Sequence, residues 1–143
     1  MNYMVDSGAT DPVIPIDEVP EVPVEESAAS KEGVHYRVAN NEEIPNLGEQ
    51  HLIAHTWNGE EWGRSKVVTT QVADVSQPII AVDTMIGNDH TVAFDSGGTL
   101  AYDKLTGEYT PFRRDNGTFH MPMWVNVAAE APKSEAGFTR PGR

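Results

Sequence analysis

The chain has 143 residues, which suits one domain, and its 22 acidic residues against 10 basic residues give a net charge of −12. This charge disfavours nucleic acids and anionic membranes as partners, and no apolar run reaches the roughly 20 residues that a membrane-spanning helix needs. The absence of cysteine excludes disulfides, thiolate metal sites and cysteine nucleophiles.

The first element is a short apolar run that ends in an aspartate. Residues 3–5 precede the sequence Asp-Ser-Gly-Ala-Thr at residues 6–10, and a second apolar run follows at 13–16. Two strands joined by a turn of small residues would hold the carboxylate of Asp6 rigidly, and Gly8 permits close backbone approach there. No basic, apolar leader precedes this strand, so we expect no signal peptide and favour an intracellular location.

The next segment, residues 17–33, is acidic and rich in proline and valine. This composition favours an extended, solvated and mobile connector. Two alternatives remain open for it. It would be a specificity loop near a cleft, or a site that basic partners recognise.

A hairpin follows the acidic segment. Residues 35–38 and 44–54 have strand character and flank a polar tip at 40–43, a pattern typical of two antiparallel strands. The hairpin is either an ordinary surface hairpin or a flap that closes over a bound peptide.

The middle of the chain predicts another hairpin and then a short helix. Asn58-Gly59 is a tight-turn signal, and the β-branched run at 67–72 favours a strand. Residues 78–81 read Pro-Ile-Ile-Ala, and residues 82–86 predict one or two helical turns that Gly87 ends.

The last third reads as short strands separated by glycine-containing turns. We expect strands at 91–94, 99–102, 109–113 and 119–127, and this spacing is typical of an all-β barrel or sandwich. Residues 128–143 are small and polar, with prolines and glycines, and we interpret them as a flexible C-terminal tail.

The motif at residues 6–9, together with the apolar pair that follows Pro78, resembles a known family. Asp6-Ser7-Gly8-Ala9 matches the D-[S/T]-G-A motif of aspartic proteases, and the chain resembles the retropepsins, closest to the protease segment of copia-type retrotransposons. Ile79-Ile80 matches their hydrophobic pair, with Ala81 where glycine is usual. The resemblance implies a domain over residues 1–127: a retropepsin-like acid-protease barrel with a flap, one short helix and extra C-terminal β-hairpins.

The resemblance also implies an activity, that of an aspartic endopeptidase with peptide or protein substrates. Asp6 would be catalytic, and a homodimer would supply one Asp6 from each subunit, because hydrolysis needs one carboxylate to take a proton and another to give one. Ser7, Gly8 and Ala9 would support the turn, and no cofactor or metal is implied. The implied substrate-binding residues are Gly8, Thr10, Asp11, Ala39, Asn40, Ile79 and Ile80.

Other readings of the same residues stay open. Asp6 would be a turn residue that caps backbone amides, in an idle domain that serves as a binding or structural module. Retropepsins commonly use an N-terminal strand to hold their dimer, but few residues precede Asp6 here. Three possibilities follow: the C-terminal hairpins hold the dimer, the chain is a piece of a polyprotein, or no stable dimer forms. A second Asp-Ser-Gly begins at Asp95, and too few residues follow it for a second lobe, so we expect a turn there. His51 and His55 lack a fixed third metal ligand, and we expect no metal site.

Overall fold

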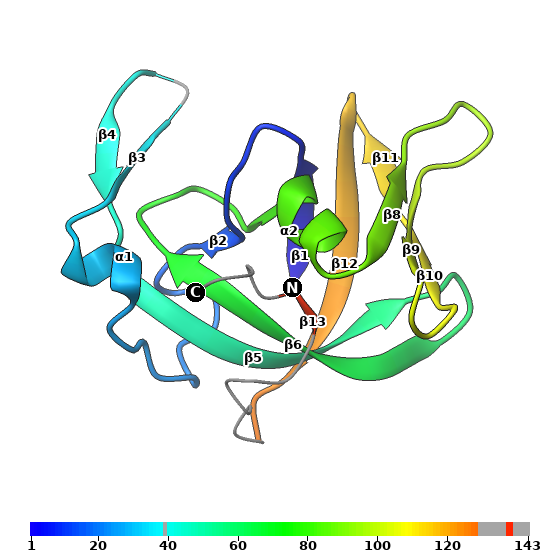
Figure 1. Cartoon of the computed structure of the whole chain (residues 1–143), viewed down its shortest axis with the longest axis horizontal. Coiled ribbons are helices and arrows are strands. Elements are labelled where there is room, and N and C mark those ends of the chain that lie inside the picture. Colours follow the sequence, from blue (N-terminus) through cyan, green and yellow to red (C-terminus); the bar gives the residue numbers. More distant parts are fainter. Residues whose placement is uncertain (39, 129–136, 139–143) are drawn as a thin grey trace.

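The computed structural model describes residues 1–38, 40–128 and 137–138, and most of its ordered elements are strands (Figure 1). Strands make up 48% of the chain and helices 8%, which confirms the predicted all-β class. Six strands close a barrel in the order β1-β7-β2-β6-β5-β12, and the pairing of β12 with β1 completes the ring. These strands are β1 (Asn2–Asp6), β2 (Val13–Ile14), β5 (Gly48–Trp57), β6 (Trp62–Val72), β7 (Ile79–Ala81) and β12 (Thr118–Asn126).

The long hairpin of β5 and β6 is the largest element of the barrel. In β5 buried residues alternate with half-buried ones along the whole strand, as a strand with one face on a core requires. The predicted turn at Asn58-Gly59 lies at the hairpin tip, where Asn58 Oδ1 accepts N–H bonds from Glu60 and Glu61, each at 2.9 Å. Gly59 adopts a φ of 101°, which favours glycine.

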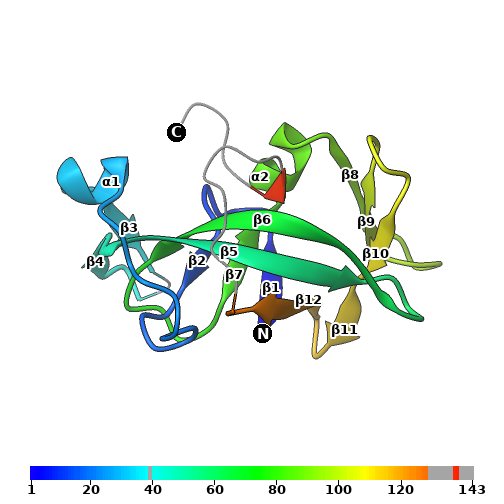
Figure 2. The same cartoon turned by 90° about the horizontal axis from the view of Figure 1, so that it is seen from below.

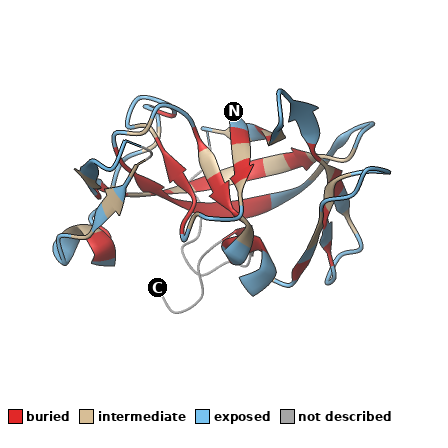
Figure 3. Cartoon of the chain, turned by 90° about the horizontal axis from the view of Figure 1, so that it is seen from above, coloured by how far each residue is buried: buried red, intermediate tan, exposed pale blue. Residues whose placement is uncertain are grey.

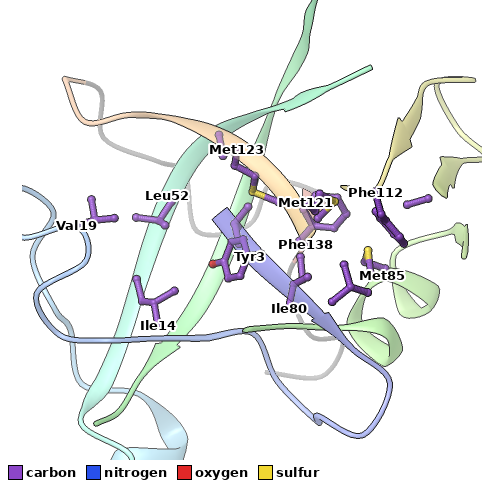
Figure 4. Packing of buried hydrophobic residues seen from close by; sticks show 14 of the residues in the cluster. Tyr3, Ile14, Val19, Leu52, Ile80, Met85, Phe112, Met121, Met123 and Phe138 are labelled. Atoms are coloured by element: carbon purple, nitrogen blue, oxygen red, sulfur yellow. The ribbon is translucent and has the colours of Figure 1, made fainter. Parts of the chain in front are cut away.

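The apolar core lies inside the barrel and beneath α2 (Figures 3 and 4). Side chains from distant parts of the chain meet there, among them Tyr3 of β1, Leu52 of β5 and Met121 of β12, all with no exposed surface. Ile80 is equally buried, so β7 is anchored in the core beside β1. The parallel register of these two strands places Asp6 opposite Ala81.

Two smaller sheets lie on opposite sides of the barrel (Figures 1 and 2). On one side, β3 (His35–Arg37) and β4 (Glu43–Pro45) form a two-stranded hairpin where one was predicted. The predicted second strand at 44–54 is divided, because residues from Gly48 onward belong to β5 of the barrel. On the other side lies a three-stranded antiparallel sheet of β8 (His90–Ala93), β9 (Leu100–Asp103) and β10 (Tyr109–Pro111). A short strand, β11 (Arg113–Asp115), pairs with the start of β12.

The described part of the chain contains two short helices where the sequence predicted one. α2 (Val82–Gly87) is the predicted helix, and α1 (Ala28–Lys31) lies in the segment predicted to be an extended connector. The local cause of α1 is a capping box, in which Ser27 and Ser30 each accept a backbone N–H from the other. Val19, Ser27 and Ala29 are buried, so the prediction of a fully solvated segment was wrong.

The C-terminal segment also differs from the prediction. Residues 137 and 138 form β13 (Gly137–Phe138), which pairs in parallel with β6. The side chain of Phe138 is 1% exposed and belongs to the core, so a flexible tail is the wrong description of these two residues. The predicted tail residues 129–136 and 139–143 lie outside the described part of the chain.

Candidate functional site

A cleft of about 580 Å³ separates the turn after β1 from the hairpin of β3 and β4. Three segments line it, and Figure 1 shows the first two facing each other across the barrel end. The turn and the strands β1 and β2 that flank it contribute Met4, Asp6, Gly8, Ala9, Thr10, Asp11 and Val13. The hairpin contributes Tyr36, Arg37, Val38, Asn40, Glu42 and Ile44, and the approach to β7 contributes Asp74, Val75, Ser76, Gln77 and Ile79.

Asp6 is the last residue of β1 and is half-buried where the strand enters the turn. Its Oδ1 atom accepts the backbone N–H of Gly8 at 2.7 Å, which fixes the carboxylate against its own turn. A side chain at position 8 would place its Cβ 3.3 Å from the same oxygen, so glycine leaves this face of the carboxylate open. Asp6 is therefore a carboxylate that is bonded to its own turn and lines the cleft.

The structure brings most of the predicted site residues to this cleft. Gly8, Ala9, Thr10, Asp11, Asn40 and Ile79 line it together with Asp6. Ser7 is exposed at the turn and is not among the lining residues. Ile80 does not line the cleft, because successive side chains of a strand point to opposite faces and Ile80 lies in the core. The remaining predicted residue, Ala39, lies outside the described residues.

The charged side chains around the cleft are mostly acidic: Asp6, Asp11, Glu42 and Asp74. The one basic residue of the lining is Arg37, whose guanidinium lies 3.0 Å from the Glu43 carboxylate on the neighbouring strand. The cleft therefore presents a negative surface to any peptide that enters it.

Sequence reasoning missed several residues of this lining, among them the polar residues Tyr36 and Asp74. Tyr36 was seen only as part of a strand, yet its hydroxyl donates to Asp11 Oδ2 at 3.3 Å across the cleft. Asp74 was given no role, yet it lines the cleft together with Ile79. No local signal marks Tyr36, because its partner Asp11 lies 25 positions earlier in the sequence.

The second Asp-Ser-Gly has the same local geometry as the first but lies elsewhere. Asp95 Oδ1 accepts the N–H of Gly97 at 2.9 Å, as Asp6 accepts that of Gly8. Asp95 is exposed and lines a separate aromatic cleft of about 550 Å³ with Phe94, Tyr109 and Phe119. The two aspartates share no lining residue, which agrees with the prediction of a simple turn at Asp95.

A third group of polar side chains is buried between β6 and the three-stranded sheet. Lys66 lies beside Asp103 and Glu108, and His90 Nε2 lies 3.7 Å from Asp103 Oδ2. Burial and the positive charge of Lys66 lower the pKa of His90 below its ordinary value, against the effect of Asp103. This group is a structural ion pair network at the junction of two sheets.

Among residues 1–38, 40–128 and 137–138, no cluster of three or more potential metal-ligating side chains is present. The same residues include no helix that is long and apolar enough to span a membrane. Comparison of the chain with models of protein families, with curated proteins and with solved structures finds no match.

Proposed function

We propose that the chain is an aspartic endopeptidase of the retropepsin type, with Asp6 as its catalytic carboxylate. The observation that carries the proposal is the position of Asp6 at the end of a barrel strand, fixed by its Asp-Ser-Gly-Ala turn and facing a hairpin across a cleft. The resemblance of residues 6–9 and 78–81 to retropepsin motifs supports it independently of this geometry.

The proposed reaction is the hydrolysis of a peptide bond by a water molecule between two carboxylates. One carboxylate takes a proton from the water, and the other gives a proton to the carbonyl oxygen of the substrate. Two close carboxylates share one proton because both cannot ionise at low cost, and the pair titrates as a unit. Each chain contributes one Asp-Ser-Gly-Ala turn, so the second Asp6 comes from a C2-related copy. The exposure of Ser7 and Gly8 at the tip of the turn leaves this surface accessible to a partner.

A second candidate is a catalytically idle domain of the same shape that binds peptides or proteins. The observation that favours it is the pairing of β1 within its own chain, with β12 at residues 2–4 and with β7 at residues 4–6. Short stretches of the strand that carries Asp6 are all that remain for a sheet between subunits. Under this alternative, Asp6 serves the turn alone and the protein is a stable monomer.

The deciding experiment measures the cleavage of a mixed peptide library from about pH 4 to 7, a range around the pKa values of such a pair. The library contains lysine- and arginine-rich peptides, because the cleft lining is mostly acidic. We expect Asp6→Asn to reduce cleavage by at least about 100-fold, the smaller end of the usual effect of removing a proton-transfer group. Specific activity should also fall on dilution, since a monomer holds half of the site.

Asp95→Asn is the matched control. It makes the same chemical change in the same three-residue motif with the same local hydrogen bond, but in the other cleft. Its cleavage rate should equal that of the wild type. Equal loss in both variants, or the absence of cleavage by folded wild-type protein at every pH, would exclude Asp6 as the catalytic group and leave the binding module.

A further inference from the structure

The hairpin of β3 and β4 needs an anchor outside its own strands. It contains only three residue pairs, His35 with Pro45, Tyr36 with Ile44 and Arg37 with Glu43. A two-stranded hairpin of this size has marginal stability by itself. Its residues are half-buried or exposed, so burial of apolar side chains contributes little to holding it in place (Figure 3).

Asn46, which directly follows β4, supplies the anchor at the base of the hairpin. Its side chain is 6% exposed and makes four hydrogen bonds. The amide oxygen accepts from the Ser27 hydroxyl at 3.0 Å and from the backbone N–H of Gly48 at 2.9 Å. The amide nitrogen donates to Gln71 Oε1 of β6 and to the Tyr36 hydroxyl, each at 2.9 Å. Both donors and both acceptor positions of the amide are therefore in use.

Tyr36 carries this network across the cleft. Its hydroxyl accepts from Asn46 and donates to Asp11 Oδ2 at 3.3 Å. Asp11 is 3% exposed and belongs to the turn that begins at Asp6. At 3.3 Å the bond to Asp11 is longer than the usual range of about 2.5–3.0 Å for an O–H···O bond, so we treat it as an ordinary hydrogen bond and not as a short charge-assisted one. One continuous chain of hydrogen bonds thus runs from the barrel, through the base of the hairpin, to the turn on the opposite wall.

We propose that Tyr36 is a positioning residue, whose hydroxyl ties the hairpin to the Asp6 turn and so sets the width of the cleft. The role rests on the proposed function, because the width of the cleft determines how an extended peptide is held against Asp6. Loss of the hydroxyl frees one wall of the cleft, and substrate binding weakens more than the chemical step at Asp6.

The test compares Tyr36→Phe with Tyr102→Phe, which makes the same chemical change on an exposed residue of β9. Amide hydrogen exchange gives a measurement that does not depend on activity. We expect the amides of residues 35–38 and 40–44 to exchange at least roughly 10-fold faster in Tyr36→Phe, because the variant loses both hydrogen bonds of the hydroxyl, the one to Asp11 and the one from Asn46. Exchange in β5 and β6 should stay unchanged, and Tyr102→Phe should match the wild type throughout.

A double-mutant cycle with Asp11→Asn tests the bond itself. The neutral amide is a weaker acceptor than the carboxylate, so the single variant should raise hairpin exchange by less than Tyr36→Phe does. The double variant should exchange like Tyr36→Phe, within about twofold, because the hydroxyl that bonds to Asp11 is already absent from Tyr36→Phe. Additive effects, or faster exchange in β5 and β6 to the same extent as in the hairpin, would overturn the proposal.

Peptide cleavage supplies the functional measurement. In Tyr36→Phe we expect KM to rise roughly 10-fold with kcat within about threefold of the wild type, since ground-state binding is the step affected. An unchanged KM together with unchanged hairpin exchange would overturn the role of Tyr36 while Asp6-dependent cleavage persists. Failure of the wild type to cleave any peptide would instead overturn the proposed function, and the exchange cycle would still decide whether Tyr36 positions the hairpin.

Discussion

Lys66 Nζ lies 2.7 Å from Asp103 Oδ2, and the two side chains are buried where β6 meets the three-stranded sheet. Lys66 also lies 3.9 Å from Glu108 Oε1, with its Nζ 5.7 Å from the centre of the Phe138 ring. Asp103 accepts two further bonds, from the backbone N–H groups of Leu105 and Thr106. This ion pair joins the barrel to the sheet formed by β8, β9 and β10.

Lys66→Met should destabilise the protein by roughly 3–5 kcal/mol, the usual cost of leaving one member of a buried ion pair uncompensated. The free energy of unfolding in urea measures this effect. Adding Asp103→Leu to the same variant should recover part of the loss, because the orphaned charge is then removed. A loss below about 1 kcal/mol in Lys66→Met would mean that water reaches the pair.

The same pair predicts a dependence of stability on pH. Burial alone would raise the pKa of Asp103, but hydrogen bonds from Lys66, Leu105 and Thr106 and the charge of Lys66 lower it to about 2, from an ordinary 3.8. Its stabilising contribution is therefore complete above about pH 4 and is lost as the pH falls toward 2. A shift of this size corresponds to about 2 kcal/mol. Urea unfolding between pH 5 and 2 should show a shallower decline in Asp103→Asn, and parallel declines would contradict the shift.

Gly48→Ala should destabilise the protein strongly. Gly48 has a φ of 134°, and a Cβ there would collide with the backbone carbonyl of Glu25 and lie 2.8 Å from Val24 Cγ1. The strand start and the acidic segment would have to separate, so we expect a loss above about 2 kcal/mol. Gly107→Ala is the control, since Gly107 has a φ of 77° with open space around it and should lose only about 1 kcal/mol. Thermal unfolding of both variants measures the difference, and similar losses would argue against the collision.

Leu52→Ala should cost about 2–5 kcal/mol, because Leu52 is fully buried in the barrel core and the truncated side chain leaves a cavity (Figure 4). Leu105→Ala makes the same change on a side chain that is 73% exposed, and its effect should stay within about 0.5 kcal/mol. The comparison uses the midpoints of denaturant unfolding, provided that the dependence of the unfolding free energy on denaturant concentration has the same slope in both variants. Comparable midpoints for the two variants would contradict the barrel core described here.

The elements that the sequence predicted well are those with local signals. Asn58-Gly59 lies at a hairpin tip and α2 lies where the helix was predicted, because turn and helix preferences depend on a few neighbouring residues. Gly87 is the last residue of α2 and Asn88 is its C-cap, so the predicted glycine cap was wrong. α1 was missed because acidic residues and prolines dominate its surroundings, although Ser27 and Ser30 form a capping box. Phe138 was missed because its strand has two residues and its partner, Val68, lies 70 positions earlier.

The candidate site was predictable only in part for the same reason. The Asp-Ser-Gly-Ala turn is a contiguous motif, and the residues it contributes to the cleft were found directly. Tyr36 acts through its bond to Asp11, and Asn46 acts through its bond to Gln71. In each pair the two residues are 25 positions apart in the sequence. Ile80 was assigned to the cleft because the sequence marks an apolar pair but not the face of the barrel to which each member points.

The pairing of β1 also bears on how the protein folds. Both partners of this strand come late in the chain, with β7 at residues 79–81 and β12 at residues 118–126. Contacts of such long sequence separation form slowly, whereas the β5–β6 hairpin closes around a local turn. In refolding, protection of the amides in β5 and β6 should therefore precede protection in β1. Asp6 is synthesised before either of the strands that hold β1, and it is among the last residues of the barrel to be fixed in place.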